Sequence, residues 1–112
     1  MKGKAKKPAS GFEAQASRLR RLARRKDVLF LYSEHADVEL AKDKLCKFDI
    51  ENMLRRCRVT LVEESDGEEA WRAEGTDRDR RRIAACVVPY EDKIRIKVIT
   101  GWAWKQRGKA KR

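Results

Sequence analysis

Four segments in the second half of the chain have the residue pattern of short β-strands. They lie at residues 58–64, 70–75, 82–88 and 94–101. Apolar and polar side chains alternate along most of them, and the third is apolar enough for a central strand. Turn-forming residues, such as the run Ser65, Asp66 and Gly67, separate them. Consecutive strands joined by short turns predict a mostly antiparallel sheet.

Helical patterns precede these strands. A short apolar run at residues 28–32 predicts one more strand, and Ser33 after it is a good N-cap for a helix over residues 34–45. The core residues expected from this helix are Val38, Ala41 and Leu45. A second helix is expected over residues 48–56, with Asp49 as its cap. Phe48 and Met53 then have the spacing of a hydrophobic staple.

A further helix is expected near the N-terminus, over residues 10–25. Ser10 and Glu13 have the spacing of a capping box. One apolar stripe runs along this helix and consists of Phe12, Ala16, Leu19 and Ala23. The sequence leaves open whether the helix packs on the rest of the protein or forms only when RNA or a partner is bound.

Together these elements predict an α+β fold. We expect a mostly antiparallel sheet of four or five strands with two or three helices packed on one face, while the other face remains open. By charge, the chain divides into a basic N-terminal arm at 1–26, one α+β domain at 27–104 and a basic tail at 105–112.

The chain of 112 residues has a formal net charge of +11, and the excess lies at its two ends. Residues 1–26 contain ten Lys and Arg against one acid, and residues 105–112 contain five and none. Residues 27–104 contain fourteen basic and seventeen acidic residues. Basic arms attract polyanions by releasing counterions, which favours RNA or the ribosome as a partner. The alternative is that the arms only keep the protein soluble.

Several classes of protein are excluded. The chain has no run of about 20 apolar residues, so we expect no membrane partner, and no apolar segment follows the basic start as in a secretory signal. The cysteines, Cys46, Cys57 and Cys86, are odd in number and form no C-x-x-C pair, which suits reduced thiols in the cytoplasm. Because they and the single His35 lack the spacing of a zinc site, we expect no metal and no cofactor.

Alternation also predicts which side chains reach the open face. In the last strand, the set expected to meet the helices is Ile94, Ile96, Val98 and Thr100. Arg95 and Lys97 then project from the open face, and Arg72 is expected to project the same way. Arg82 begins the central strand at its loop end.

The loop before Arg82 adds Arg78, Arg80 and Arg81. Arginine forks match phosphate oxygens, and Tyr90, Trp102 and Trp104 offer rings on which unpaired bases stack. The alternative is a salt-bridged surface, because acidic residues are near in the sequence. They are Glu74, Asp77, Asp79 and Glu91.

His35 is the only histidine and is expected in the first turn of a helix. The positive helix end disfavours imidazolium, so a neutral ring there suits an acid or base in RNA cleavage. The alternative is a packed histidine without a catalytic role.

The order of these pieces resembles a domain of unknown function in small bacterial proteins, a relative of the BrnT-type and RelE-type toxins of the barnase–colicin–RelE fold. The matching pieces are SEHA (33–36), FDIENML (48–54), WRAEG (71–75), RRIAACVV (81–88) and IRIKVIT (94–100). They span residues 28–104, which is the body without either basic arm. The resemblance implies a sheet with helices on one side, an RNA-binding groove on the other, and cleavage of mRNA without metal, restrained by an antitoxin.

The resemblance also implies roles for single residues. His35 falls on the histidine that begins the first helix in such domains, Arg72 and Arg82 on basic positions of the middle strands, and Arg95 on the arginine of the I-R-I piece. Thr100 takes the place of the Ser or Thr that ends the last strand. The chain departs from the pattern at residues 41–44, where an Arg is usual, and at Cys46, where a Ser is usual. The resemblance places the start of the second helix near Lys47.

The leading hypothesis is therefore a toxin-like RNA-binding protein, acting as a metal-independent mRNA endoribonuclease of a type II toxin–antitoxin system. The ribose 2′-hydroxyl would attack the adjacent phosphate, with His35 as acid or base and Arg72, Arg82 and Arg95 stabilising the developing charge. The residues expected to bind RNA are Lys97, Arg80, Arg81, Thr100 and Trp102. The expected partners are mRNA, free or on the ribosome, and an antitoxin protein. The alternatives are a non-catalytic RNA- or ribosome-binding module and a protein-interaction domain.

Overall fold

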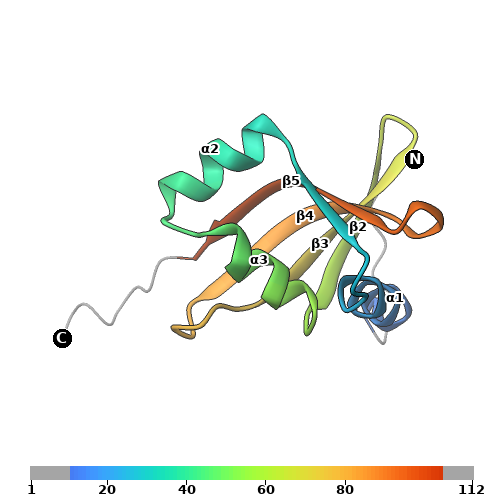
Figure 1. Ribbon diagram of the computed structural model, residues 1–112, viewed down its shortest axis with the longest axis horizontal. Coiled ribbons are helices and arrows are strands. Elements are labelled where there is room, and N and C mark those ends of the chain that lie inside the picture. Colours follow the sequence, from blue (N-terminus) through green and yellow to red (C-terminus); the bar gives the residue numbers. More distant parts are fainter. Residues whose placement is uncertain (1–10, 105–112) are drawn as a thin grey trace.

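The computed structural model describes residues 11–104, which form three helices and a five-stranded sheet (Figure 1). In chain order the elements are α1 (Glu13–Ala23), β1 (Leu29–Tyr32), α2 (Glu34–Lys42), α3 (Lys47–Leu54), β2 (Arg58–Ser65), β3 (Glu68–Thr76), β4 (Arg82–Tyr90), a 3-10 turn (Glu91–Lys93) and β5 (Arg95–Ala103). The expected tail at 105–112 lies outside the described residues.

The sheet has the strand order β1-β5-β4-β3-β2. Strands β2 to β5 pair antiparallel, and β1 pairs parallel with β5 at one edge. The three helices lie on one face of the sheet (Figure 1), and all of them contribute buried residues to one hydrophobic core. The predicted α+β class, with a mostly antiparallel sheet and helices on one face, is therefore confirmed.

Helix α1 packs on the body, which settles the question that the sequence left open. The predicted stripe is buried, and Leu22 joins it in the core. The N-cap is Phe12, whose side chain makes no capping bond, while the carboxylate of Glu13 accepts a hydrogen bond from Arg20 at 2.7 Å. The predicted capping box depends on Ser10, which lies outside the described residues.

Helix α2 begins at the predicted cap. The Ser33 hydroxyl accepts a hydrogen bond from the backbone N–H of Ala36 at 3.0 Å and donates one to the carbonyl of Ile99 at 2.9 Å. This second bond joins the start of the helix to β5, and Ala36 and Leu40 enter the core. The prediction that Val38 is a core residue is wrong, because its side chain points away and is 54% exposed.

The two other predicted core residues, near the end of α2, have different outcomes. Ala41 is exposed, so the prediction for it is wrong, whereas Leu45 is buried as expected. The helix ends at Lys42, three residues earlier than predicted, and Lys44 then adopts a left-handed backbone conformation with φ of 54°.

Helix α3 begins at Lys47, near the start that the resemblance implied, with Cys46 as its N-cap. The prediction that Asp49 caps this helix is wrong. Asp49 is its third residue, and its carboxylate accepts hydrogen bonds from the Cys46 thiol at 3.1 Å and from Arg78 at 3.0 Å. The staple is wrong for the same reason, since Phe48 lies inside the first turn and is 52% exposed.

A β-bulge in β5 changes which residues face the helices. Val98 pairs with Val87 and Thr100 pairs with Cys86, so Ile99 is an extra residue between them. The prediction that Thr100 shares the face of Val98 is therefore wrong. Beyond the bulge, Gly101 faces the helices, where an added Cβ would lie 2.8 Å from a methyl carbon of Leu40.

Candidate nucleic-acid interface

The face of the sheet opposite the helices carries a mixed set of basic, acidic and aromatic side chains. Strand pairing assigns residues to this face, because paired residues lie on the same side. The basic residues on it are Arg58, Arg72, Arg82, Arg95 and Lys97, and the acidic residues are Glu63, Glu68 and Glu74. The basic residues predicted for the last and middle strands therefore do reach the open face.

Three of these arginines, from three neighbouring strands, surround one carboxylate. Arg58 and Arg82 each place a terminal nitrogen near one oxygen of Glu74, at 3.5 and 3.4 Å, and the Nε of Arg72 lies 3.4 Å from the other oxygen. The Glu74 residue is only 6% exposed although it lies on the uncovered face. We call these four residues, with Thr60, the arginine cluster.

Thr60 joins the cluster because β2 is irregular at this point. The pairing of β2 with β3 shifts between Val59 and Leu61. The Thr60 hydroxyl donates a hydrogen bond to Glu74 at 2.8 Å and accepts one from the Nε of Arg72 at 3.0 Å. Thr60 therefore orients both the carboxylate and one of the guanidinium groups.

The guanidinium groups of the cluster keep unused donors. Each arginine has five N–H donors, so the three together present roughly fifteen, far more than one carboxylate accepts. Their side chains are 68%, 34% and 58% exposed for Arg58, Arg72 and Arg82. The cluster carries two formal positive charges in excess, and a solvent-borne oxyanion could reach them.

Two tryptophans adjoin the cluster where β5 ends. The guanidinium carbon of Arg82 lies 4.1 Å from the ring centre of Trp104. The rings of Trp102 and Trp104 are 5.8 Å apart and tilted by 60°. In the sheet Trp102 pairs with Ala84, which itself pairs with Glu74, so the rings and the cluster share one end of the open face.

The other predicted residues on this face lie apart from the cluster. Arg95 pairs with Tyr90, and Lys97 with Val88. Tyr90 is four residues along β4 from Cys86, the partner of Arg72, which is about 13 Å at 3.3 Å per residue. Thr100 lies two strands from Arg72 at the same level of the sheet, because both residues pair with Cys86.

His35 is not brought to the cluster. It is the second residue of α2, is exposed, and follows edge strand β1. Helix α2 packs on β5 on the helix side of the sheet, whereas the arginine cluster lies on the opposite face. The structure thus brings Arg72, Arg82 and Trp102 together but leaves His35 and Arg95 at separate places.

The arginines of the loop between β3 and β4 have different environments. Arg81 forms an ion pair with Asp77 at 2.8 Å and donates a hydrogen bond to the carbonyl of Asp43 at 2.9 Å, so it ties the loop to the end of α2. Arg78 pairs with Asp49, while Arg80 is exposed and has a left-handed backbone with φ of 66°. Arg78 and Arg80 are therefore both exposed to solvent, Arg78 with a paired carboxylate, whereas Arg81 is held inside the loop.

The Asp77 side chain in this loop is buried, and its contacts lower the pKa of its carboxyl. Burial raises the pKa of this carboxyl, but hydrogen bonds from Arg81 and from the backbone N–H of Asp79 lower the pKa by more than burial raises it, so the net shift is downward. Because its pKa is lower in the folded state, the Asp77 carboxylate contributes its full stability above the unfolded pKa of about 3.9. This contribution is lost as the pH falls below that value and through the lowered pKa of the folded state.

We expect Asp77→Asn to lower the free energy of unfolding at pH 7 by about 1–3 kcal/mol, because buried N–H groups and the Arg81 guanidinium lose a charged acceptor. We also expect stability to fall less steeply below pH 4 in this variant than in the wild type. Urea unfolding at pH 3 to 7 measures both effects. Asp92→Asn, in the exposed 3-10 turn, is the control, and equal acid sensitivity in all three proteins would contradict the prediction.

Sequence reasoning missed Arg58 and Thr60 and took Glu74 only as a neutralising residue. Alternation along residues 58–64 does place Arg58 and Thr60 on the same side, so this part of the signal was present. Their approach to Glu74 depends on the irregular pairing of β2, which no local pattern indicates.

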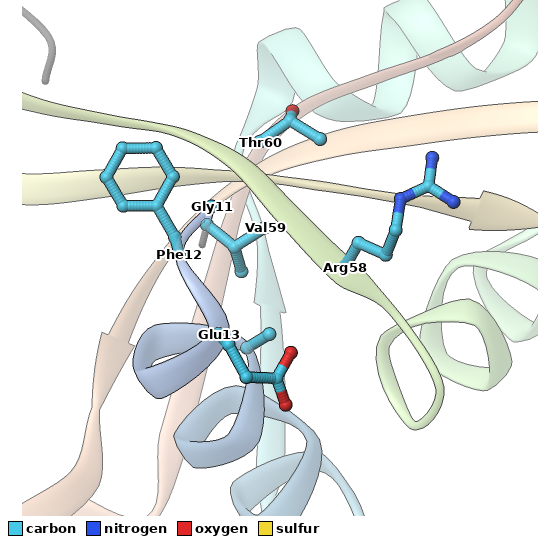
Figure 2. Close-up of a pocket in the computed structure, with 7 residues that line it drawn as sticks. Gly11, Phe12, Glu13, Arg58, Val59 and Thr60 are labelled. Carbon is cyan, nitrogen blue, oxygen red and sulfur yellow. The ribbon is translucent and has the colours of Figure 1, made fainter. Parts of the chain in front are cut away.

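A hollow of about 220 Å³ opens between the start of α1 and β2, as Figure 2 shows. Phe12, Ala16 and Val59 form its apolar side. Because Arg58 and Thr60 also line it, the hollow adjoins the arginine cluster at the β2 edge.

Comparison of the chain with models of known protein families, with curated proteins and with solved structures found no match. Within residues 11–104, no helix is long and apolar enough to cross a membrane. In the same part of the chain, no three His, Cys, Asp or Glu side chains are grouped so that they could hold a metal ion.

Proposed function

We propose that the protein binds single-stranded RNA on the uncovered face of its sheet. The observation that carries this proposal is the arginine cluster, in which three guanidinium groups from β2, β3 and β4 share one carboxylate beside two tryptophans. Arginine forks bind phosphate oxygens, and the two excess charges of the cluster favour a phosphodiester.

The tryptophans favour a single strand over a duplex. Every base has a face that stacks on an aromatic ring, but in a duplex these faces are already stacked on each other. Trp102 and Trp104 are half-buried and lie next to Arg82, so a base on the rings would place its phosphate near the cluster. The lysines at 2–7 and the basic residues at 105–112 add charge that strengthens binding without reading sequence.

Binding is better supported than cleavage. Cleavage by attack of the 2′-hydroxyl needs an acid or base beside the phosphate. His35 lies on α2, which packs on β5 on the helix side of the sheet, and Arg95 pairs with Tyr90 at the end of the open face away from the cluster. The toxin activity and antitoxin partner that the resemblance implies therefore remain hypotheses, which the experiment below also tests.

Trp102→Leu combined with Trp104→Leu should weaken binding of a ten-nucleotide single-stranded RNA roughly tenfold or more, since stacking contributes about 1–3 kcal/mol per base. In the wild type, RNA should quench tryptophan fluorescence. The double variant keeps only Trp71, which is 2% exposed and serves as the internal control whose emission should not change.

The same titration with a duplex of equal length should give weaker binding to the wild type. Equal affinity for single strand and duplex, together with unchanged affinity of the double variant, would contradict the proposal. Gel analysis of the RNA after incubation with wild type and with His35→Ala tests cleavage, and new 5′ ends that depend on His35 would restore the endoribonuclease hypothesis.

A further inference from the structure

Glu74 occupies the position in the arginine cluster that an oxyanion ligand would prefer. Both of its oxygens face guanidinium groups, one toward Arg58 and Arg82 and the other toward Arg72. The Glu74 side chain is only 7% exposed and has lost most of its water, so these contacts replace hydration.

The contacts are loose for charge-assisted hydrogen bonds. They measure 3.4 to 3.5 Å, whereas a tight bond from a guanidinium to a carboxylate is about 2.7–2.9 Å. The closest partner of the Glu74 carboxylate is the neutral Thr60 hydroxyl at 2.8 Å. The three guanidinium groups thus surround Glu74 without being saturated by it.

We propose that Glu74 is an internal counterion that limits the affinity of the arginine cluster for phosphate. A phosphodiester at this position must share the guanidinium groups with a carboxylate of the same charge, and the two anions repel each other. Glu74 holds the arginines together in the free protein, and it weakens their hold on the ligand. This inference rests on the proposed function in taking RNA as the natural source of the phosphate.

Glu74→Gln separates these two effects. Glutamine keeps a carbonyl oxygen that accepts hydrogen bonds from Thr60 or Arg72, so the cluster can retain its arrangement, but it removes the negative charge. We expect this variant to bind the single-stranded RNA roughly three- to tenfold more tightly than the wild type at about 0.1 M salt. A residue with only a structural role would give unchanged or weaker binding.

Glu68→Gln is the matched control. Glu68 lies on the same face, on β3, four residues from Arg72 and six from Glu74. Its distance from Arg72 is about 13 Å along the strand, and from Glu74 about 20 Å, both beyond the Debye length of about 10 Å at 0.1 M salt. Because the net charge changes equally in both variants, affinity that rises as much in Glu68→Gln as in Glu74→Gln would overturn the inference.

Inorganic phosphate distinguishes this inference from the proposed function. We expect phosphate to shift the Nε–H NMR signals of Arg72 and Arg82 at lower concentration in Glu74→Gln than in the wild type. If RNA binds but Glu74→Gln does not tighten the binding of either probe, the inference fails and the proposed function stands. If the wild type does not bind RNA but the variant binds phosphate more tightly, the proposed function fails and the counterion role stands.

A measurement on the wild type covers the case in which Glu74→Gln does not fold, which thermal unfolding would reveal. The carboxylate carbon signal of Glu74 should shift during RNA titration together with the Arg72 and Arg82 signals, because ligand and carboxylate share the same donors. Arginine signals that shift while the Glu74 signal stays constant would overturn the inference.

Discussion

A chain that begins at residue 27, without α1, is expected not to fold. Three large apolar side chains of this helix, Phe12, Leu19 and Leu22, are at most 6% exposed. Burial of each contributes about 1.5–3 kcal/mol, so together they contribute roughly 5–9 kcal/mol. A domain of this size has a total stability of about 5–15 kcal/mol. Loss of the helix therefore removes a burial free energy comparable with the total free energy of unfolding of the domain.

Hydrogen bonds between α1 and the rest of the protein also stabilise the fold. Arg20 donates a hydrogen bond to the carbonyl of Cys57 at 2.8 Å, and Arg24 donates one to the carbonyl of Arg55 at 2.9 Å. In return, Arg55 donates to the carbonyl of Ala23 at 3.1 Å, so the ends of α1 and α3 cap each other. Without α1, the end of α3 and the start of β2 lose these partners.

Circular dichroism and thermal unfolding test this expectation. A chain that begins at residue 11 is the control and should unfold cooperatively near the wild-type midpoint, since every described contact remains. The full chain with Leu19→Ala should still fold but lose about 2–5 kcal/mol of the free energy of unfolding. A chain without residues 1–26 that unfolds cooperatively at the wild-type midpoint would show that the helix is not part of the core.

Most of the fold could be predicted because its signals are local. Helical spacing of apolar residues identified the buried stripe of α1, and a change to alternation after Cys57 identified the strands. What could not be predicted depends on contacts between distant residues. Helix α2 has apolar residues on more than one face, and only its packing on β5 shows that Leu40 is buried while Val38 is exposed.

The candidate site was predicted less completely for the same reason. Alternation correctly placed Arg72, Arg95 and Lys97 on the open face, because it requires only strand geometry. Which of them meet is decided by strand order and register. Arg58 and Arg72 are neighbours through the pairing of β2 with β3, whereas Arg72 and Arg95 lie two strands and several residues apart.

Arg72→Ala combined with Arg82→Ala should weaken binding of single-stranded RNA roughly 30- to 100-fold near 0.1 M salt. The two side chains approach Glu74 from neighbouring strands, and Arg82 also packs on Trp104, so both charge and geometry are lost together. Each phosphate contact on a single strand contributes about 0.7 to the slope of log affinity against log salt. Loss of two contacts should therefore reduce the slope by about 1.4.

Arg21→Ala combined with Arg25→Ala is the charge-matched control. Arg21 is exposed on α1 and Arg25 is exposed in the turn after it, on the helix side of the sheet, and Arg25 already pairs with Asp27. If RNA binds through net charge alone, the two double variants should lose equal affinity, and that result would contradict a site on the open face.

Arg72→Lys combined with Arg82→Lys then separates charge from shape. Lysine keeps the charge but cannot offer the planar fork that binds two phosphate oxygens at once, and it stacks less well on Trp104. We expect the lysine variant to keep the salt slope of the wild type and to lose roughly tenfold in affinity. Wild-type affinity in the lysine variant would mean that the cluster acts only as a patch of charge, because the fork geometry of the arginines would then contribute nothing.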